Sequence, residues 1–221
     1  TDIYYGGDPV WFWNNIQGIG DSRIHNGVTV HYNGATGDAI DGGQCGANAF
    51  WTLDKNGTLT VSGAGAMYDY DYDDSTSPWL IWDVSKIKKI DVREGITAIG
   101  AYAFCQLSSA AEVSLPSTLT AIGQDAFWGI GAASLVIPDS VKRIDNFAFN
   151  TCVNLKTITL PAGLQEIGHC FIECEALKTI YFGGSMADWL ACGGGQSIFP
   201  AKTSVVCQGG GTLYRSGTCG D

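Results

Sequence analysis

Apolar and polar residues recur in the same order every 22 or 23 residues between Ile87 and Phe182. Each period opens with a short apolar-x-apolar segment typical of a strand, and the five segments end at residues 92, 115, 137, 160 and 182. Side chains alternate faces along a strand, so Val113 and Leu115 are predicted to point inward and Ser114 outward. A fixed period of this size predicts a solenoid whose successive coils share one apolar interior.

The rest of each period is also regular. Proline, which cannot donate to a strand ladder, follows three of the strands at positions 116, 138 and 161. An Ile-Gly pair such as Ile99-Gly100 then bends the chain, and a stretch ending in Ala-Phe, such as Ala103-Phe104, is interpreted as a short helical turn. The later periods depart at Asp145, where glycine is lost, and at Phe171-Ile172, where Ala-Phe is expected.

Over residues 87–182 the motif reads Leu-x-x-(Ile/Val)-x-(Leu/Ile)-Pro-x-x-(Leu/Val)-x-x-Ile-Gly-x-x-Ala-Phe. This motif resembles the BspA-like leucine-rich repeat family of bacterial cell-surface proteins. The resemblance implies an α/β solenoid, coiled as a right-handed leucine-rich repeat, with a parallel sheet on one face and short helical turns on the other. It also implies a surface-exposed or secreted module that binds a partner.

The two ends of the repeat array are expected to be closed by atypical segments. Strand-forming residues 50–53 and 58–61 flank Asn56-Gly57, which predicts a β-hairpin that caps the N-terminal end. The segment from Trp51 to Met67 also resembles the one that often precedes these repeats. We expect Trp79 and Trp82 to fold over the first coil, and Trp189 to plug the other end.

A second, longer period lies outside the array. Residues 3–5 match 180–182, residues 29–34 match 204–209, and Cys45-Gly46 matches Cys219-Gly220, with offsets near 175 residues. We therefore expect tandem modules in a longer protein, also because the chain starts at a strand-like segment without a signal peptide. The strand edge of Ile3–Tyr5 is predicted to pair with the opening of the complete module or with a neighbouring copy.

The expected division of the chain follows from these two periods: 1–34 is the closing segment of a preceding module, 35–44 a linker, 45–86 the β-rich cap, 87–182 the repeats, 183–209 the C-terminal closing segment and 210–221 a Gly-rich linker.

The charge and composition of the chain limit the kinds of partner that it can bind. The formal net charge is −10 and the sequence pI is about 4.5, which argues against nucleic acid and against docking on anionic membranes. No apolar stretch approaches the roughly 18 residues needed to span a bilayer, so no membrane insertion is expected. Of the eight cysteines, Cys152 and Cys174 stand where other periods carry Leu107 and Ile130, which predicts small buried residues. A bridge between Cys192 and Cys207 is left open.

Chemical motifs are sparse. Asp69, Asp71 and Asp73, with Asp74, could supply oxygen ligands to calcium, but the loop lacks the glycine and distal glutamate of an EF-hand, and a solvated acidic loop is the alternative. His169-Cys170 with Cys174 has metal-like spacing but too few ligands for zinc. Neither a Gly-x-Ser-x-Gly elbow nor a His-Glu-x-x-His motif is present, so we predict no enzyme and no cofactor.

The remaining candidate is the outward side of the strands. Its predicted ligand-surface row consists of Asp91, Ser114, Val136, Thr159 and Tyr181. Trp128 is interpreted either as an exposed aromatic for a sugar or protein partner, or as a residue packed against a neighbouring turn. We therefore predict an extracellular or cell-surface module that binds protein or carbohydrate; the alternative is a passive spacer.

Overall fold

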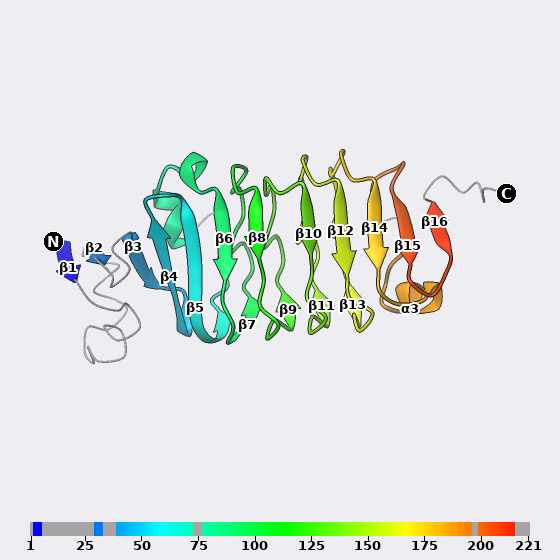
Figure 1. Ribbon diagram of the computed structural model, residues 1–221, viewed down its shortest axis with the longest axis horizontal. Coiled ribbons are helices and arrows are strands. Elements are labelled where there is room, and N and C mark those ends of the chain that lie inside the picture. The colour runs from blue at the N-terminus through cyan, green and yellow to red at the C-terminus, as the bar shows by residue number, and fades with distance from the viewer. Residues whose placement is uncertain (1, 6–28, 33–38, 73–76, 196–198, 215–221) are drawn as a thin grey trace.

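The computed structural model describes residues 2–5, 29–32, 39–72, 77–195 and 199–214. Short strands lie side by side along the long axis of the molecule, and the two ends of the chain lie at opposite ends of that axis (Figure 1). Each predicted coil contributes one turn of this stack. The structure is a β-solenoid, so the predicted solenoid and its parallel sheet are confirmed.

One face of the coils carries the strands predicted from the apolar-x-apolar segments. They are β6 (Lys89–Val92), β8 (Glu112–Ser114), β10 (Ser134–Val136), β12 (Thr157–Leu160) and β14 (Thr179–Phe182). Leu135, Ile158 and Ile180 stand opposite one another in parallel register and are buried. Val113 is paired with Ile90 but is half-buried. Among the described residues β8 and β10 do not pair, so this face consists of two sheets.

A second parallel sheet runs along the next side of the coils, and sequence reasoning missed it. It contains β7 (Ile96–Ile99), β9 (Ala121–Ile122), β11 (Arg143–Ile144) and β13 (Glu166–Ile167). Ile99, Ile122, Ile144 and Ile167 stand in register across it. These segments were interpreted as bends because three of the four strands are only two residues long and show no alternation of their own.

The third side was predicted to be helical, and the α/β character is not confirmed. Its segments are turns in which residues such as Tyr102 and Asp125 take positive φ of 54° and 51°. The Phe104 N–H donates to the Ala126 carbonyl at 2.7 Å, and the Tyr102 and Gln106 N–H groups likewise donate to the next coil. The N–H groups between them close single turns within the coil, as the Cys105 N–H does to the Tyr102 carbonyl at 3.3 Å, so inter-coil and single-turn hydrogen bonds alternate and no continuous helix forms. The direction of coiling stays a prediction.

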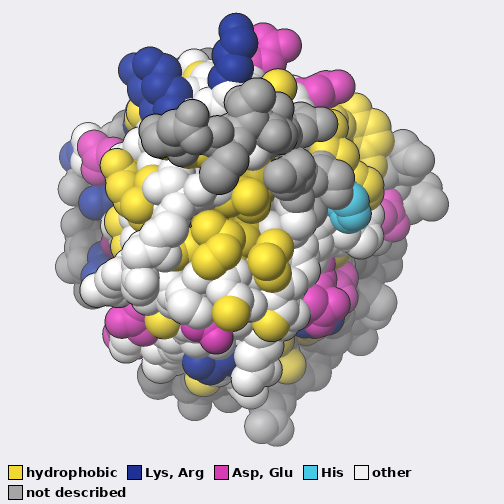
Figure 2. Space-filling model, turned by 90° about the vertical axis from the view of Figure 1, so that its right-hand side faces the viewer, with side chains coloured by type: hydrophobic (Ala, Val, Ile, Leu, Met, Phe, Trp, Pro, Cys, Tyr) yellow, Lys and Arg dark blue, Asp and Glu magenta, His cyan; other side chains and the backbone are white. Residues whose placement is uncertain are grey.

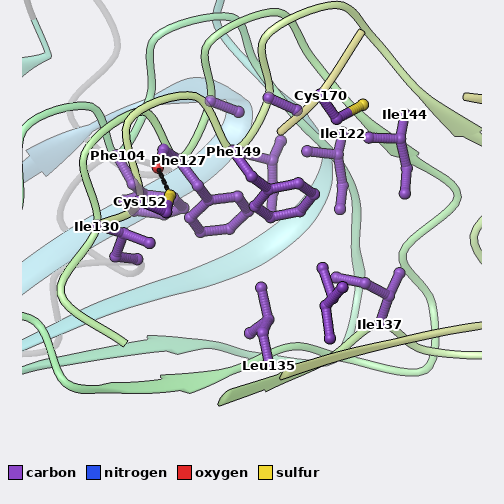
Figure 3. Packing of buried hydrophobic residues seen from close by; sticks show 14 of the residues in the cluster. Phe104, Ile122, Phe127, Ile130, Leu135, Ile137, Ile144, Phe149, Cys152 and Cys170 are labelled. Carbon is purple, nitrogen blue, oxygen red and sulfur yellow. Dashed lines mark hydrogen bonds between the residues drawn. The ribbon is translucent and has the colours of Figure 1, made fainter. Parts of the chain in front are cut away.

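Phenylalanine rings form a column inside the coils. Phe104, Phe127, Phe149 and Phe171 stack at centroid separations of 5.4, 5.6 and 5.7 Å (Figure 3). Phe171 occupies the expected phenylalanine position, so Cys170-Phe171, and not Phe171-Ile172, corresponds to Ala-Phe. Cys152 and Cys174 are fully buried, as predicted, and their thiols donate to the Phe127 and Phe149 carbonyls of the preceding coil at 3.3 and 2.9 Å.

Both ends of the shared interior are closed by tryptophan. At the N-terminal end Trp79 is fully buried and stacks on Phe104 at 5.4 Å. Trp79 lies in the 3₁₀ helix η1 (Pro78–Ile81), which is followed by η2 (Val84–Lys86). At the other end Trp189 is fully buried against Phe182 at 5.4 Å and lies in the helix α3 (Met186–Ala191). The predicted roles of both tryptophans as end plugs are confirmed.

The N-terminal cap is an antiparallel sheet that continues into both parallel sheets. β4 (Gly46–Asp54) and β5 (Thr58–Met67) form the hairpin predicted around Asn56-Gly57. β5 pairs with β6 through its first half and with β7 through its second half. Gly63 allows the bend between the halves: its φ is +111°, and a Cβ there would lie 2.1 Å from the Asn48 carbonyl oxygen.

Three segments differ from the predicted division of the chain. Residues 39–44, placed in a linker, form β3 (Ala39–Gln44), which pairs antiparallel with β4. In the predicted Gly-rich linker, β16 (Thr212–Tyr214) pairs antiparallel with β15 (Ser204–Cys207). β1 (Asp2–Tyr5) pairs in parallel with β2 (Thr29–Tyr32) and, among the described residues, not with the opening of the complete module; pairing with a neighbouring copy stays a prediction. All three pairings depend on sequence-distant or glycine-rich context that local patterns do not encode.

Candidate ligand-binding face

The outward row predicted from the repeat is present as two shorter rows. Asp91 stands beside Ser114, and Val136 beside Thr159, Tyr181 and then Val206 of β15. The unpaired edges of β8 and β10 separate these rows. Val136 is 68% exposed and Tyr181 47% exposed, whereas the Asp91 side chain is largely covered.

The two rows differ in charge. Around the first, Arg93 contacts Asp91 at 2.7 Å and Lys89 contacts Glu112 at 3.8 Å. The strands around the second row, β10, β12, β14, β15 and β16, contain no Asp, Glu, Lys or Arg. We call the outward side chains of these five strands the uncharged face; they are Ser134, Val136, Thr157, Thr159, Thr179, Tyr181, Ser204, Val206, Thr212 and Tyr214. On a chain with a net charge of −10 this face is unusual.

Trp128 lies on a different side of the molecule, and its packing interpretation is favoured. It is half-buried, and its ring lies 5.3 Å from that of Tyr72 at an angle of 47°. The Gln106 side-chain amide lies within hydrogen-bonding distance of the Tyr72 hydroxyl at 3.4 Å. The loop that contains Asp69 and Asp71 therefore lies against the turns of the first coils, and Tyr72 covers part of Trp128.

The acidic loop contains no assembled metal site in its described part. Asp69 accepts a hydrogen bond from the Ala101 N–H at 2.8 Å, so one carboxylate fastens the loop to the first coil. Asp71 is exposed, and Asp73 lies outside the described residues. Elsewhere among the described residues, no three His, Cys, Asp or Glu side chains gather as metal ligands would. Calcium binding here stays a hypothesis.

Sequence reasoning did not find a hollow of about 400 Å³ beside the second sheet. The lining of the hollow contains the small residues Ala98, Gly100, Ala121 and Gly123. Its charged residues are Asp69, Arg143 and Asp145. Its lining contains no serine, cysteine or histidine, so it offers no nucleophile and base pair for acyl transfer. The arrangement can accommodate a small polar molecule.

Asp145 occupies the position that glycine holds in the neighbouring coils. The Asp145 N–H donates to the Ile122 carbonyl of the preceding coil at 2.9 Å. The Gly123 and Gly168 N–H groups make the equivalent bonds in their coils, so the loss of glycine leaves the backbone hydrogen-bond pattern unchanged. Burial raises the pKa of the Asp145 carboxyl, while Arg143, at 3.3 Å, lowers it. The one signal for this position in the sequence was the replacement of glycine by a charged residue.

The cysteines in the described part of the chain are buried. The seven described cysteines are buried free thiols, and they include Cys192 and Cys207, so the bridge left open for this pair is not formed. Burial raises the pKa of the thiols of Cys45, Cys105 and Cys170, to about 11 for Cys105. A raised pKa disfavours the nucleophilic thiolate at neutral pH.

The fold and its outward face define a solenoid built from short leucine-rich coils. The family model for the BspA type leucine rich repeat region matches residues 82–190 in six copies, one more than the five coils counted from the sequence. Residues 82–190 therefore belong to the BspA-type leucine-rich repeat family.

Solved structures show the same architecture. A leucine-rich repeat protein from Eubacterium ventriosum is 26% identical, with a TM-score of 0.54 over 69% of this chain and 45% of that one. A leucine rich cell surface protein from Faecalibacterium prausnitzii is 19% identical, with a TM-score of 0.51 over 74% and 44%. The pneumococcal vaccine antigen PcpA is 17% identical, with a TM-score of 0.53 over 81% and 46%. The chain spans less than half the length of each of these proteins.

No curated protein matches the sequence. Among the described residues, no helix has the length and apolarity that a membrane crossing requires.

Proposed function

We propose that this chain is a non-enzymatic module of a bacterial surface or secreted protein, and that it binds a protein or glycan through the uncharged face. The observation that carries the proposal is the absence of charge from β10, β12, β14, β15 and β16 in an acidic chain, together with the exposure of Val136, Tyr181 and Tyr214.

The physical reason is the cost of desolvation. Removing water from an unpaired charge is far more costly than removing it from an apolar group or a hydroxyl that regains a hydrogen bond. On the uncharged face, Tyr181 supplies a ring that can contact an apolar surface or a sugar ring. Thr157, Thr159 and Thr179 supply hydroxyl groups beside it. This combination suits an uncharged partner surface better than a charged one.

The extracellular or cell-surface location is part of the proposal. It is supported by the BspA-type repeats and by the description of the F. prausnitzii structure as a cell surface protein. Solenoids commonly bind through such extended faces.

A protein and glycan binding screen on the intact chain tests this function. The decisive variants are Val136→Asp and Val153→Asp, because both valines are exposed, 68% and 54%, but Val153 lies in a turn outside the uncharged face. We expect Val136→Asp and Tyr181→Ala to weaken binding at least tenfold with an unchanged melting temperature. Val153→Asp should bind like the unsubstituted protein. Equal affinity of all variants for the identified partner would contradict the proposal.

A passive spacer in a tandem-module protein is the second candidate, and one observation favours it. The parallel pair β1–β2 repeats the pair β14–β15 in both sequence and register. If the chain is a spacer, the screen should identify no partner. The Val136→Asp and Val153→Asp variants should then have the same melting temperature and bind nothing.

A further inference from the structure

Two strand pairs at opposite ends of the chain are equivalent. Ile3 stands opposite Val30 in β1–β2, and Ile180 stands opposite Val205 in β14–β15; both pairs are parallel. The sequences also match, Ile-Tyr-Tyr with Ile-Tyr-Phe and Thr-Val-His-Tyr with Ser-Val-Val-Cys. β1–β2 therefore has the structure of the last parallel strands of a module that precedes the complete one.

The next strand is equivalent as well. The offset of 174 that aligns Cys45 with Cys219 also aligns Ala39 with Leu213, so β3 corresponds to β16. The two strands occupy equivalent places in the repeating module, but each pairs with a different neighbouring strand. β16 pairs antiparallel with β15, which ends a module, and β3 pairs antiparallel with β4, which begins one.

The surroundings of the two strands agree with this equivalence. β3 lies between β2 and β4 in Figure 1, and β2 and β3 are in contact, but in the described part of the chain no strand ladder joins them. β16 is the last strand of its sheet in the described part of the chain. This end of the molecule shows a cluster of hydrophobic side chains (Figure 2), and Leu190 of the helix α3 is 57% exposed. An open strand edge next to an apolar surface is a ready site for pairing.

We propose that β16 is a strand shared between two modules. It pairs antiparallel with β15 on one edge and with the β4-like strand of a following module on the other, so the sheets of successive modules join. The partner is a second copy of this module, with a segment similar to β4 and β5. The proposal rests on the tandem organisation proposed above as the spacer, and it does not depend on ligand binding at the uncharged face.

The junction already contained in this chain allows a direct test by cross-linking. Val205 stands opposite Leu213, and the equivalent residues at the other end are Val30 and Ala39. We expect Val30→Cys with Ala39→Cys to form a disulfide under mild oxidation as completely as Val205→Cys with Leu213→Cys. The control, Val30→Cys with Asp41→Cys, is two residues out of register and should form at least tenfold less, because bridged Cα atoms must lie within about 7 Å. Peptide mapping identifies each bridge among the native cysteines.

Failure of the 30–39 bridge while the 205–213 bridge forms would overturn the proposal. So would equal bridging of the 30–39 and 30–41 pairs, because this would show that β2 and β3 have no fixed register. Neither outcome bears on whether the uncharged face binds a ligand.

A two-module protein tests the continuity of the sheet. It consists of residues 1–209 followed by residues 35–221, which reproduces the natural spacing; in its control, residues 35–44 of the second copy are replaced by a Gly-Ser segment of equal length. We expect one unfolding transition and a rod-like X-ray scattering profile. Two separate transitions, or a profile indistinguishable from that of the control, would overturn the proposal.

Discussion

Phe127 and Phe149 stack inside adjacent coils with their ring centroids 5.6 Å apart and their planes inclined by 4°. Both rings are fully buried, so each forms part of the interior that neighbouring coils share. A coil cannot bury such a ring by itself, and the stability of each coil therefore depends on its neighbours.

Replacing Phe127 by alanine tests this dependence. We expect Phe127→Ala to lower the free energy of unfolding by about 3–5 kcal/mol, because a ring is lost from both of its stacking contacts. The neighbouring Trp128→Ala should cost only about 1 kcal/mol, since a partly exposed aromatic pair is worth roughly 0.5–1.5 kcal/mol. Denaturant unfolding followed by circular dichroism measures both. Equal costs for the two variants would contradict the assignment of Phe127 to the interior.

Adjacent residues of β12 test the inward and outward assignments. Leu160 is fully buried, whereas Thr159 points to the uncharged face. Leu160→Asp places an unpaired charge in the shared interior, so we expect loss of cooperative unfolding at neutral pH. Thr159→Asp should melt within a few degrees of the unsubstituted protein. A cooperative melt of Leu160→Asp at the original temperature would show that the strand faces the other way.

The partly buried Asp145 carboxylate in the hollow should make stability depend on pH in one direction. The pKa of Asp145 is raised in the native state, mainly by burial. The native state therefore holds the proton more tightly than the unfolded chain, whose aspartate pKa is about 3.9. The contribution of this group to stability is present at low pH and is lost as pH rises through the native pKa.

Asp145→Asn removes this titration. We expect the variant to match the unsubstituted protein near pH 3 and to become progressively more stable than it as pH rises to 7. Denaturant unfolding at a series of pH values gives the difference, which isolates Asp145 from exposed carboxylates such as Glu94, whose pKa is lowered and whose effect has the opposite sign. A constant difference across the range would refute the role of Asp145 titration.

Buried thiols should resist alkylation. Burial raises the pKa of Cys105 to about 11 and also raises that of Cys170, while Cys152 and Cys174 are enclosed between coils. At pH 8 we expect iodoacetamide to modify these four positions at least a hundredfold more slowly in the native protein than in denaturant. Mass spectrometry reads each site separately. Rapid native labelling of Cys152 or Cys174 would show that the coils open readily.

Much of the fold followed from positions that repeat in phase. The inward residues Leu135 and Ile158 were predicted because alternation within the strand and recurrence between coils agree. The second sheet was missed because a strand such as Arg143–Ile144 is too short to alternate. The sequence predicts helical turns because residues such as Tyr102 give no local sign of a positive φ. Contacts with the next coil set that conformation.

The candidate face was predictable only in part. The outward row could be read from the repeat, including Val136 and Tyr181, but its division into two rows could not. Whether β8 pairs with β10 depends on how two adjacent coils pack against each other. The sequence of a single period does not determine that packing. The same limit applies to Trp128, whose partner Tyr72 comes from a loop outside the repeats.

The tryptophans at the two ends of the shared interior also determine how such chains can change in length. Trp79 meets the first phenylalanine, and Trp189 packs beside the last strand of the array. Each intermediate coil presents nearly the same two surfaces to the coil before it and to the coil after it. An in-frame duplication or deletion of 22 or 23 codons would therefore lengthen or shorten the rod by one step while leaving both terminal contacts as they are.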